Sequence, residues 1–326
     1  MLIRPRRNRR TEAIRSMVRE TSLSSANLIY PYFIVDGNNQ KVAIPSLPGL
    51  HRMSEDNLLR DMEEAMELGL RNFVLFPAVE EALKDKTATY SYAEENFYLR
   101  IIRNVKERFP EVSLMSDVAM DPYSSDGHDG LVEDGEILND ATLPILEKMS
   151  VAQAQAGIDI IGPSDMMDGR VEAIREALDD EGYEDVAIMS YTAKYASAYY
   201  GPFRDALESA PKSGDKKTYQ MDPANKREAL READLDMDEG ADYLMVKPAL
   251  CYLDVIHLLK EECDVPITAY NVSGEYAMLK AACQNGWLDY DKAMPEMLLS
   301  IRRAGADGIL TYFAKDFAKM YKEGRV

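Results

Sequence analysis

Eight short runs rich in β-forming residues recur along the 326-residue chain, and amphipathic helical patterns separate them. Strands that alternate with helices in this way predict parallel βαβ units, and a single barrel domain commonly uses a chain of this length. The expected strands are residues 27–35, 72–78, 113–120, 160–164, 187–194, 243–249, 266–273 and 308–314. The clearest helical patterns between them are residues 55–68, 141–156, 171–180 and 225–239.

Chemically capable side chains stand at the carboxyl ends of many of these runs. An open, doubly wound sheet has the same local pattern, but it gathers its site at one switch point between two strands. A closed barrel instead brings every strand end to one face. We therefore expect an α/β fold of the (β/α)8 TIM-barrel class, with a site built from six strand ends that carry Asp117, Ser164, Lys194, Lys247, Ser273 and Tyr312.

The first 25 residues differ in charge from the rest of the chain. Residues 1–20 hold seven arginines, whereas the formal net charge of the whole chain is −19. This acidic balance disfavours nucleic acid as a partner. We interpret residues 1–25 as an extended N-terminal arm that lies on an acidic neighbouring subunit, and residues 26–326 as a single catalytic barrel. A solvated tail is the alternative for the arm.

The segment 197–225 interrupts the alternation of strands and helices. It is long, rich in Gly, Pro and charged residues, and follows directly on the strand that carries Lys194. Loops of this length are typical of active-site lids or of disordered segments. We expect a lid around residues 197–225.

Membrane and disulfide signals are missing from the sequence. No run of eighteen apolar residues predicts a membrane helix, so we expect no membrane partner. Cys251, Cys263 and Cys283 have no paired spacing, which argues against a disulfide framework and against a thiolate zinc site. The default expectation for location is the cytoplasm.

Two lysines lie at the ends of predicted buried strands, Lys194 in AIMSYTAK and Lys247 in YLMVKPA. Burial disfavours the ammonium form, so lysines inside apolar strands are rare, and the ordinary alternative is an amine that extends to the surface. A lowered pKa supplies the neutral amine that attacks a ketone to form an imine, and a second ammonium nearby lowers it further. Phosphate binding is the competing role, but no Gly-rich loop adjoins either lysine.

Six long segments occur in an order that is highly specific: DVAMDPYSSDGHDG (117–130), GPSDMMDGRVEAIREALD (162–179), MSYTAKYASAYYGPFRDA (189–206), GDKKTYQMDPAN (214–225), EGADYLMVKPALCYLD (239–254) and NVSGEYAM (271–278). Together they resemble the δ-aminolevulinic acid dehydratase family, also called porphobilinogen synthase, from RPRR near the N-terminus to TYFA. The resemblance implies a (β/α)8 barrel with an N-terminal arm, usually a homo-octamer. It also implies condensation of two 5-aminolevulinate molecules into porphobilinogen in tetrapyrrole biosynthesis.

The resemblance implies roles for the two lysines. Lys247, in MVKP, is similar to the lysine that forms a Schiff base with the substrate giving the propionate arm of the product. Lys194, in AKYAS, is similar to the lysine that engages the substrate giving the acetate arm. Imine formation makes the neighbouring carbon acidic, so a base is needed, and Asp117 or a lysine is the candidate. Ser164 is a further candidate for contact with substrate.

The resemblance also implies residues that hold the substrate carboxylates. Arg204 and Lys216 match cationic positions of the lid that bind one carboxylate, and Gln220 matches a polar neighbour. The family often has arginine at the position of Lys216, and a lysine there lacks the bidentate geometry of a guanidinium. Ser273 and Tyr312 match hydroxyls that hold the other carboxylate; a hydrogen bond to backbone at the strand end is the alternative for both.

The metal ligands of the family's zinc-dependent members are absent. Those members carry three cysteines where this chain has Ala119, Asp121 and Asp129, so a three-cysteine zinc site is excluded. Aspartates prefer hard cations such as Mg²⁺. Two interpretations stay open for the aspartates of this segment: a Mg²⁺ site, or acids that orient lysine and water. They apply to Asp117, Asp121, Asp126 and Asp129, with His128 as a hydrogen-bonding neighbour rather than a ligand.

A second metal position follows from the resemblance alone. Glu232, in REALREADLD, matches family members that bind an activating, allosteric Mg²⁺ between subunits. The ordinary alternative is an exposed glutamate on a helix. The cofactor we expect is therefore Mg²⁺, with no zinc and no organic cofactor.

Three other functions compete with the one that the resemblance implies. Another lysine-dependent lyase on the same barrel would need a phosphate site and would leave the second lysine unexplained. A metal hydrolase built on DGHDG has one histidine and no second cluster. A non-catalytic binding protein would tolerate the strand-end lysines only if acids paired with them, and borohydride trapping of an imine separates that class from the enzymes.

Overall fold

Eight parallel strands close into a barrel in the computed structural model, which describes residues 1–207 and 211–326. The pairing of Leu28 with Ile309 and of Ile29 with Leu310 joins the first barrel strand to the last one and closes the sheet. All eight expected strands and the (β/α)8 fold are confirmed. The barrel strands are β1 (Leu28–Ile34), β4 (Asn72–Pro77), β5 (Ser113–Met115), β8 (Ile160–Ile161), β9 (Ala187–Lys194), β10 (Tyr243–Lys247), β11 (Ile267–Asn271) and β12 (Gly308–Thr311).

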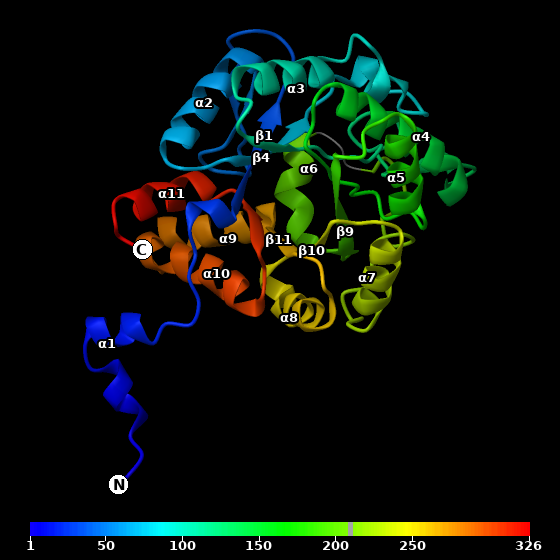
Figure 1. Ribbon diagram of the computed structural model, residues 1–326. Coiled ribbons are helices and arrows are strands. Elements are labelled where there is room, and N and C mark those ends of the chain that lie inside the picture. Colours follow the sequence, from blue (N-terminus) through cyan, green and yellow to red (C-terminus); the bar gives the residue numbers. More distant parts are fainter. Residues whose placement is uncertain (208–210) are drawn as a thin grey trace.

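Helices lie outside the barrel and connect its strands (Figure 1). They are α2 (Glu55–Glu67), α3 (Phe97–Arg108), α4 (Asn139–Gln155), α5 (Arg170–Asp180), α6 (Gly201–Leu207), α7 (Glu228–Asp238), α8 (Leu253–Glu262), α9 (Ser273–Gln284), α10 (Tyr290–Ala304) and α11 (Ala314–Lys322). The four helices expected from sequence are among them. Two antiparallel hairpins occur in addition to the barrel strands: β2 (Lys41–Ala43) with β3 (His51–Met53), and β6 (Leu131–Glu133) with β7 (Glu136–Leu138).

The same hydrogen bond, from a backbone N–H to an aspartate side chain, recurs at the amino ends of three barrel strands. Each of β8, β10 and β12 follows a Gly-x-Asp sequence, in which the glycine ends the preceding connection with positive φ. The aspartate carboxylate then accepts a backbone N–H from the first or second residue of the neighbouring strand, which sets the register of the pair. The bonds run from Leu114 N to Asp159, from Ile188 N to Asp242 and from Ile267 N to Asp307, at 2.8, 2.8 and 3.0 Å.

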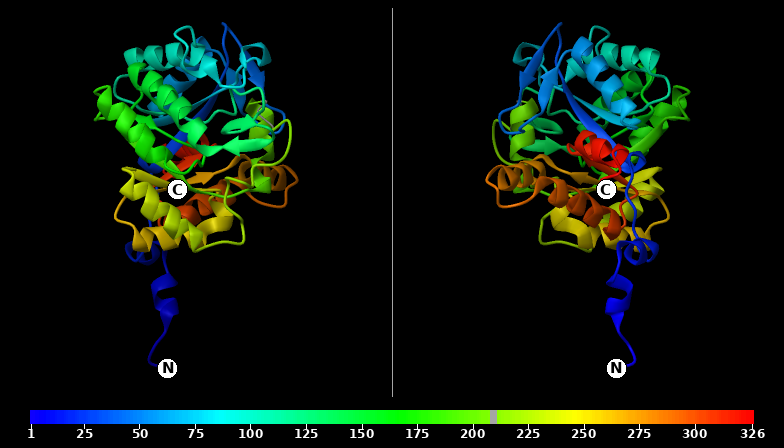
Figure 2. Two further views of the ribbon diagram at one scale, coloured as in Figure 1. Left: turned by 90° about the vertical axis from the view of Figure 1, so that its right-hand side faces the viewer. Right: turned by 90° about the vertical axis from the view of Figure 1, so that its left-hand side faces the viewer.

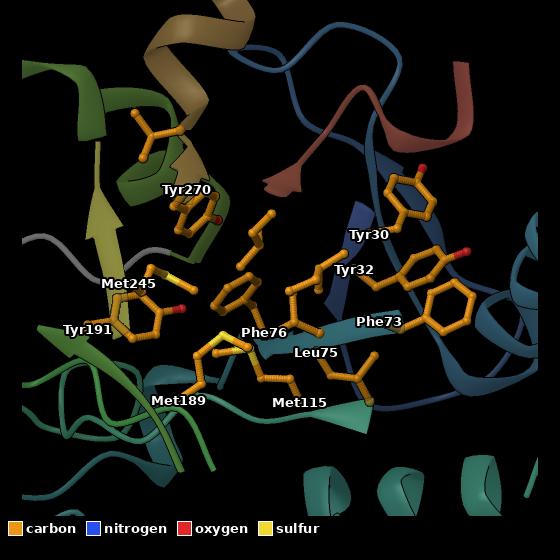
Figure 3. Packing of buried hydrophobic residues seen from close by; sticks show 14 of the residues in the cluster. Tyr30, Tyr32, Phe73, Leu75, Phe76, Met115, Met189, Tyr191, Met245 and Tyr270 are labelled. Carbon is orange, nitrogen blue, oxygen red and sulfur yellow. The ribbon is translucent and has the colours of Figure 1, made fainter. Parts of the chain in front are cut away.

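The barrel interior is filled by large apolar side chains. Phe76, Met115, Met189 and Met245 meet there, each from a different strand (Figure 3). Bulky residues in layers are the usual filling of such a barrel, so the interior is a packed core and not a pore. The site must therefore lie above this core, at the carboxyl ends of the strands.

The N-terminal segment projects away from the barrel (Figures 1 and 2). It contains a 3-10 turn (Pro5–Arg9) and α1 (Glu12–Met17), whose N-cap Thr11 accepts a hydrogen bond from Ile14 N at 3.2 Å. Its apolar residues face solvent: Met1 is 94% exposed and Met17 is 78% exposed. The extended arm expected from sequence is thus present. No described helix is both long and apolar enough to cross a bilayer.

The segment 197–225 is more ordered than the sequence pattern indicated. A 3-10 turn (Ala198–Tyr200) leads into α6, so the lysine-bearing strand is followed by a helix and not by an irregular loop. Residues 208–210, inside the predicted lid, lie outside the described residues. The far end of the segment returns to the barrel, where Met221 N donates to Lys194 O at 3.0 Å.

Candidate active site

A small cavity at the carboxyl ends of the strands collects most of the residues that the sequence singled out. Its volume is about 30 Å³, enough for a water molecule and far below the several hundred Å³ of a typical ligand site. Five of its lining residues belong to the segment 197–225. The lining residues are Asp117, Asp121, Asp129, Ser164, Lys194, Tyr200, Phe203, Arg204, Lys216, Gln220 and Lys247.

Lys247 and Lys194 are direct partners in the barrel ladder, where the end of β10 pairs with the end of β9. Both side chains are buried, with 6% and 5% of their surface exposed. The Lys247 amine lies inside an aromatic cage, and none of the described residues accepts a hydrogen bond from it. The rings of Tyr191, Tyr200, Phe203 and Tyr270 have their centroids 4.7–5.2 Å from its Nζ.

Burial lowers the pKa of Lys247 to about 7, and the nearby ammonium of Lys194 adds to the effect, while Asp117 opposes it. Aromatic faces attract an ammonium but do not accept its protons as a carbonyl does. Burial also raises the pKa of Asp117 to about 6, against the pull of Lys247. An amine and a carboxyl that both titrate near neutral pH are suited to nucleophilic attack and to proton transfer.

Lys194 has a different environment from Lys247. Its Nζ donates to Asp129 at 3.0 Å and makes a short hydrogen bond to the backbone carbonyl of Ser164. Asp129 also accepts from Lys216 Nζ at 2.5 Å, and Lys216 lies 3.4 Å from Asp121. Burial opposes ionisation of Asp129, but Lys194 and Lys216 outweigh it and lower its pKa to about 2. One buried carboxylate thus holds two ammonium groups.

A bulge in β9 aims Lys194 into the cavity. Ser190 pairs with Leu244, but three residues further along β9 Ala193 pairs with Val246, only two residues on. Ser190 faces outward, where its hydroxyl bonds to Asp236 at 2.7 Å. Strict alternation would place Lys194 on that same outer face, since both positions are even-numbered. The extra residue reverses the phase, so Lys194 lines the cavity.

The ends of β5 and β8 approach closely to place Asp117 and Ser164. Backbone bonds continue past the regular strands, from Val118 N to Gly162 O and from Ser164 N to Val118 O, both at 2.9 Å. A Cβ on Gly162 would come within 2.6 Å of the Ser116 carbonyl oxygen, so only glycine allows this approach. The residues that line the cavity here are therefore held by backbone rather than by a flexible loop.

The segment 197–225 supplies the roof. Phe203 and Arg204 come from α6, and Lys216 and Gln220 from the return to the barrel. His128 hydrogen-bonds this return: its ring nitrogens lie 3.1 Å from the Tyr219 hydroxyl and 2.9 Å from the Ser213 carbonyl oxygen. The structure thus gives His128 hydrogen-bonding partners.

Two predicted substrate residues lie outside the cavity lining. The Ser273 hydroxyl accepts from Phe203 N at 3.0 Å and donates to Tyr199 O at 3.3 Å, so it contacts the backbone of the roof. The Tyr312 hydroxyl pairs with that of Tyr270 at 2.7 Å. Because Tyr270 belongs to the cage around Lys247, Tyr312 is joined to the site through it.

Glu232 lies apart from these residues, on α7. Burial raises its pKa to about 7, and the carboxylates of Asp236 and Asp168 add to the effect, whereas Arg170 opposes it. A half-buried carboxylate among other carboxylates binds cations favourably. Asp236 is engaged by Arg170 and Ser190, so Glu232 is the carboxylate here that can serve as one ligand of a Mg²⁺ ion that keeps most of its waters.

The aspartates of the cavity fit a metal less well. Asp129 and Asp121 already face ammonium groups, and a dication would have to displace them. No group of three or more metal-ligating side chains was found among residues 1–207 and 211–326. The arrangement favours the second interpretation of this segment, in which the acids orient the lysines.

Sequence reasoning missed the aromatic cage. Tyr191, Tyr200, Phe203 and Tyr270 stand near the predicted lysines along the chain or at a strand end, but aromatic residues in buried strands are ordinary core residues. Figure 3 places Tyr191 and Tyr270 on either side of Met245, at the edge of the core. The spacing of these aromatic residues along the sequence did not predict that they surround the Lys247 amine.

Comparison with known proteins identifies the family of this chain. The model of the family described as delta-aminolevulinic acid dehydratase matches residues 2–320. The chain belongs to this family. A delta-aminolevulinic acid dehydratase of Bradyrhizobium diazoefficiens is 53% identical over 98% of this chain and 91% of its own length. A chloroplastic delta-aminolevulinic acid dehydratase of Physcomitrium patens is 56% identical over 100% of this chain and 76% of its own length.

A solved structure of the family has the same fold. The delta-aminolevulinic acid dehydratase of Toxoplasma gondii, in complex with its reaction product porphobilinogen, superposes with a TM-score of 0.96. It is 52% identical, and the match covers 98% of this chain and 91% of that one. The family resemblance expected from the six segments is confirmed.

Proposed function

We propose that the cavity at the carboxyl ends of the strands is the site where this member of the family joins its two substrates, with Lys247 as the nucleophile. The enzyme is a hydro-lyase, a porphobilinogen synthase that condenses two molecules of 5-aminolevulinate with loss of two waters. The observation that carries the role of Lys247 is its buried amine, with a pKa near 7 and no hydrogen-bond acceptor among the described residues.

The chemistry at Lys247 begins with the neutral amine. Its lone pair attacks the ketone carbon of one substrate, and the carbinolamine loses water to give an imine. The imine withdraws electrons and makes the neighbouring C–H acidic, so a base can remove that proton. Asp117, buried beside Lys247 with its pKa raised to about 6, is placed to accept and return protons.

The second substrate is taken up at Lys194. In the closed site Asp129 and the Ser164 carbonyl accept hydrogen bonds from this lysine, which keeps its amine aimed at the cavity. After loss of a proton, a carbon of the second substrate attacks the imine carbon, and the Lys247 amine leaves as the carbon–carbon bond is established. The amino group of the first substrate then condenses with the second ketone, which closes the pyrrole ring and removes the second water. A dry, closed site protects the imines from hydrolysis in the meantime.

Substrate entry requires the roof to open. Two five-carbon substrates cannot fit into about 30 Å³, so the described residues 197–207 and 211–225 must move as a lid. We propose that Arg204 and Lys216, with Gln220 beside them, bind one substrate carboxylate, and that Ser273 and Tyr312 bind the other. Lys216 would then exchange its contact with Asp129 for the substrate.

The pH dependence tests the role of Lys247 and Asp117. The reactive forms are the neutral amine, present above pH of about 7, and the ionised carboxylate, present above pH of about 6. We expect kcat/KM to rise with pH, by about tenfold per pH unit between 6 and 7 and more steeply below 6. Initial rates measured from pH 5 to 8 give kcat/KM as a function of pH. A flat profile would contradict the roles of Lys247 and Asp117.

We further propose that Mg²⁺ binds at Glu232 and that no zinc is needed. A cation there would act by favouring an active assembly, since Glu232 lies outside the cavity. Because the Glu232 pKa is raised to about 7, Mg²⁺ should bind more tightly as pH rises from 6 to 8 and should displace a proton.

Glu232→Ala is expected to abolish both calorimetric Mg²⁺ binding and Mg²⁺ stimulation of the rate, while borohydride trapping of substrate is kept. Asp234→Ala, an exposed change on the same helix, is the matched control and should respond to Mg²⁺ as the parent does. A zinc-selective chelator should leave all three rates unchanged. If Glu232→Ala keeps the parental Mg²⁺ response, the residue is a surface carboxylate only.

The N-terminal arm supports a homo-oligomer, which we propose to be an octamer. Among the described residues, the bonds of its arginines stay within the arm, at Arg7, Arg15 and Arg19. Met1 and Met17 are exposed, and the remainder of the chain is acidic. Deletion of residues 1–20 should lower the assembly mass measured by light scattering and leave the far-ultraviolet circular dichroism unchanged. An unchanged mass would refute the role of the arm. Cytoplasmic location stays a prediction, and relatives of this chain include chloroplastic proteins.

A further inference from the structure

The roof helix α6 depends on contacts with the rest of the fold. Its described part has seven residues, Gly201–Leu207, and isolated helices of about this length are unstable in water. Yet α6 must hold Phe203 beside Lys247, with 5.2 Å between the ring centroid and Nζ, and Arg204 against the cavity. Contacts from elsewhere in the fold must therefore hold it.

Arg52 supplies such a contact at the carboxyl end of α6. Its Nε donates to Ala206 O and its Nη2 donates to Asp205 O, both at 2.6 Å. A guanidinium is planar and rigid, so it can bond two successive carbonyls at once. Its positive charge also lies at the negative end of the helix dipole.

The strand that carries Arg52 is firmly attached to the barrel. Arg52 lies on β3, opposite Phe33 of β1 and opposite Val42 of β2. The same hairpin reaches the other end of α6, where the Ser46 hydroxyl donates to Pro202 O at 3.3 Å. The β2–β3 hairpin therefore holds α6 at both ends, from a part of the chain about 150 residues away in sequence.

We propose that Arg52 is a positioning residue for the condensation: by bonding the last carbonyls of α6 it holds the roof closed, and so sets Phe203 and Arg204 against the substrates. The inference rests on the proposed role of the cavity. Since the cavity is too small for the substrates, α6 must leave and return in each turnover, and Arg52 favours its return. Loss of these bonds would lower the closed fraction and with it the apparent affinity.

Arg52→Ala should raise KM for 5-aminolevulinate by about tenfold or more, because hydrogen bonds from charged groups are individually strong. The kcat should stay within about threefold, since bound substrate itself favours closure through Arg204. Arg52→Lys should recover part of the KM loss, and added guanidinium ion should lower the KM of Arg52→Ala selectively. Arg60→Ala, which removes an exposed arginine paired only with neighbours on its own helix, is the control.

The outcomes separate a positioning role from a structural one. A fall in kcat or in melting temperature with unchanged KM would mean that Arg52 only supports folding, and would overturn the inference. A KM for Arg52→Ala equal to that of the parent would also overturn the inference. Borohydride trapping at saturating substrate should label the parent and Arg52→Ala equally. Failure to label either protein would instead count against the proposed role of Lys247.

Discussion

Replacement of Lys247 by Met is expected to abolish imine trapping of 5-aminolevulinate and to lower kcat by about 10⁴-fold or more. Removal of a nucleophile commonly has effects of this size, because the remaining groups act only in concert with it. Methionine is similar in length and makes favourable contacts with aromatic rings, so the cage around position 247 should accept it. Borohydride treatment with substrate, followed by mass spectrometry, measures the trapping.

The same replacement should stabilise the fold. The pKa of Lys247 is lowered to about 7, so the folded state binds fewer protons than the unfolded chain between pH of about 7 and 10.5. The lysine therefore costs stability below pH of about 10.5, and the full cost is reached as pH falls to 7. A tenfold change in proton affinity corresponds to about 1.4 kcal/mol, which sets an upper limit of about 4 kcal/mol for the gain at neutral pH.

The two effects together make the experiment decisive. A variant that is more stable, fully assembled and inactive identifies Lys247 as a functional residue retained at a cost to stability. Lys194→Met is the comparison variant, and it should still allow imine trapping at Lys247. The pH midpoint of trapping should move upward, because the Lys194 ammonium is one cause of the lowered pKa of Lys247. Normal turnover by Lys247→Met would sink the assignment.

Asp129→Asn is expected to lower both stability and activity strongly. Asp129 is 1% exposed and holds Lys194 at 3.0 Å and Lys216 at 2.5 Å. An amide of the same shape leaves the buried Lys194 without the carboxylate that it bonds, and leaves Lys216 with Asp121 alone, at 3.4 Å. Breaking one side of a buried ion pair typically costs about 3–5 kcal/mol. We expect a loss of about that size in urea unfolding, and a fall in kcat of at least about 100-fold as the lysines reorient.

The sign of the pH dependence provides a further check. Because the pKa of Asp129 is lowered to about 2, its contribution is present above the unfolded value near 4 and is lost as pH falls toward 2. The deficit of Asp129→Asn should therefore be full at pH 5 and should shrink below pH 4. Asp215→Asn, which alters an exposed carboxylate paired with Lys217, should leave the urea midpoint nearly unchanged. Equal stability of both variants would show that the lysines do not depend on Asp129.

Local patterns in the sequence were sufficient to predict the barrel and the two lysines. Alternation of short β-rich runs with amphipathic helices indicated parallel units, and all eight strands form. The boundaries of the strands were predicted less accurately. The predicted strands 113–120 and 160–164 extend beyond β5 and β8, because backbone hydrogen bonds around Gly162 continue the pairing without regular strand geometry. The segment 197–225 contains α6, a helix that is hydrogen-bonded by Arg52 and Ser273, which lie far away in the sequence.

What the sequence determined by itself is the period of each element and the residue types at the strand ends, because these depend on neighbours a few positions away. That is why the lysines, the aspartates and the closed barrel were all predictable. Only the tertiary structure decided which way Lys194 points, since a single extra residue in β9 reverses the face of every position after it. It also decided that four aromatic rings meet at Lys247 and that one carboxylate serves two lysines. The charge state of a buried group depends on what surrounds it in space, and those neighbours come from strands and helices far apart along the chain.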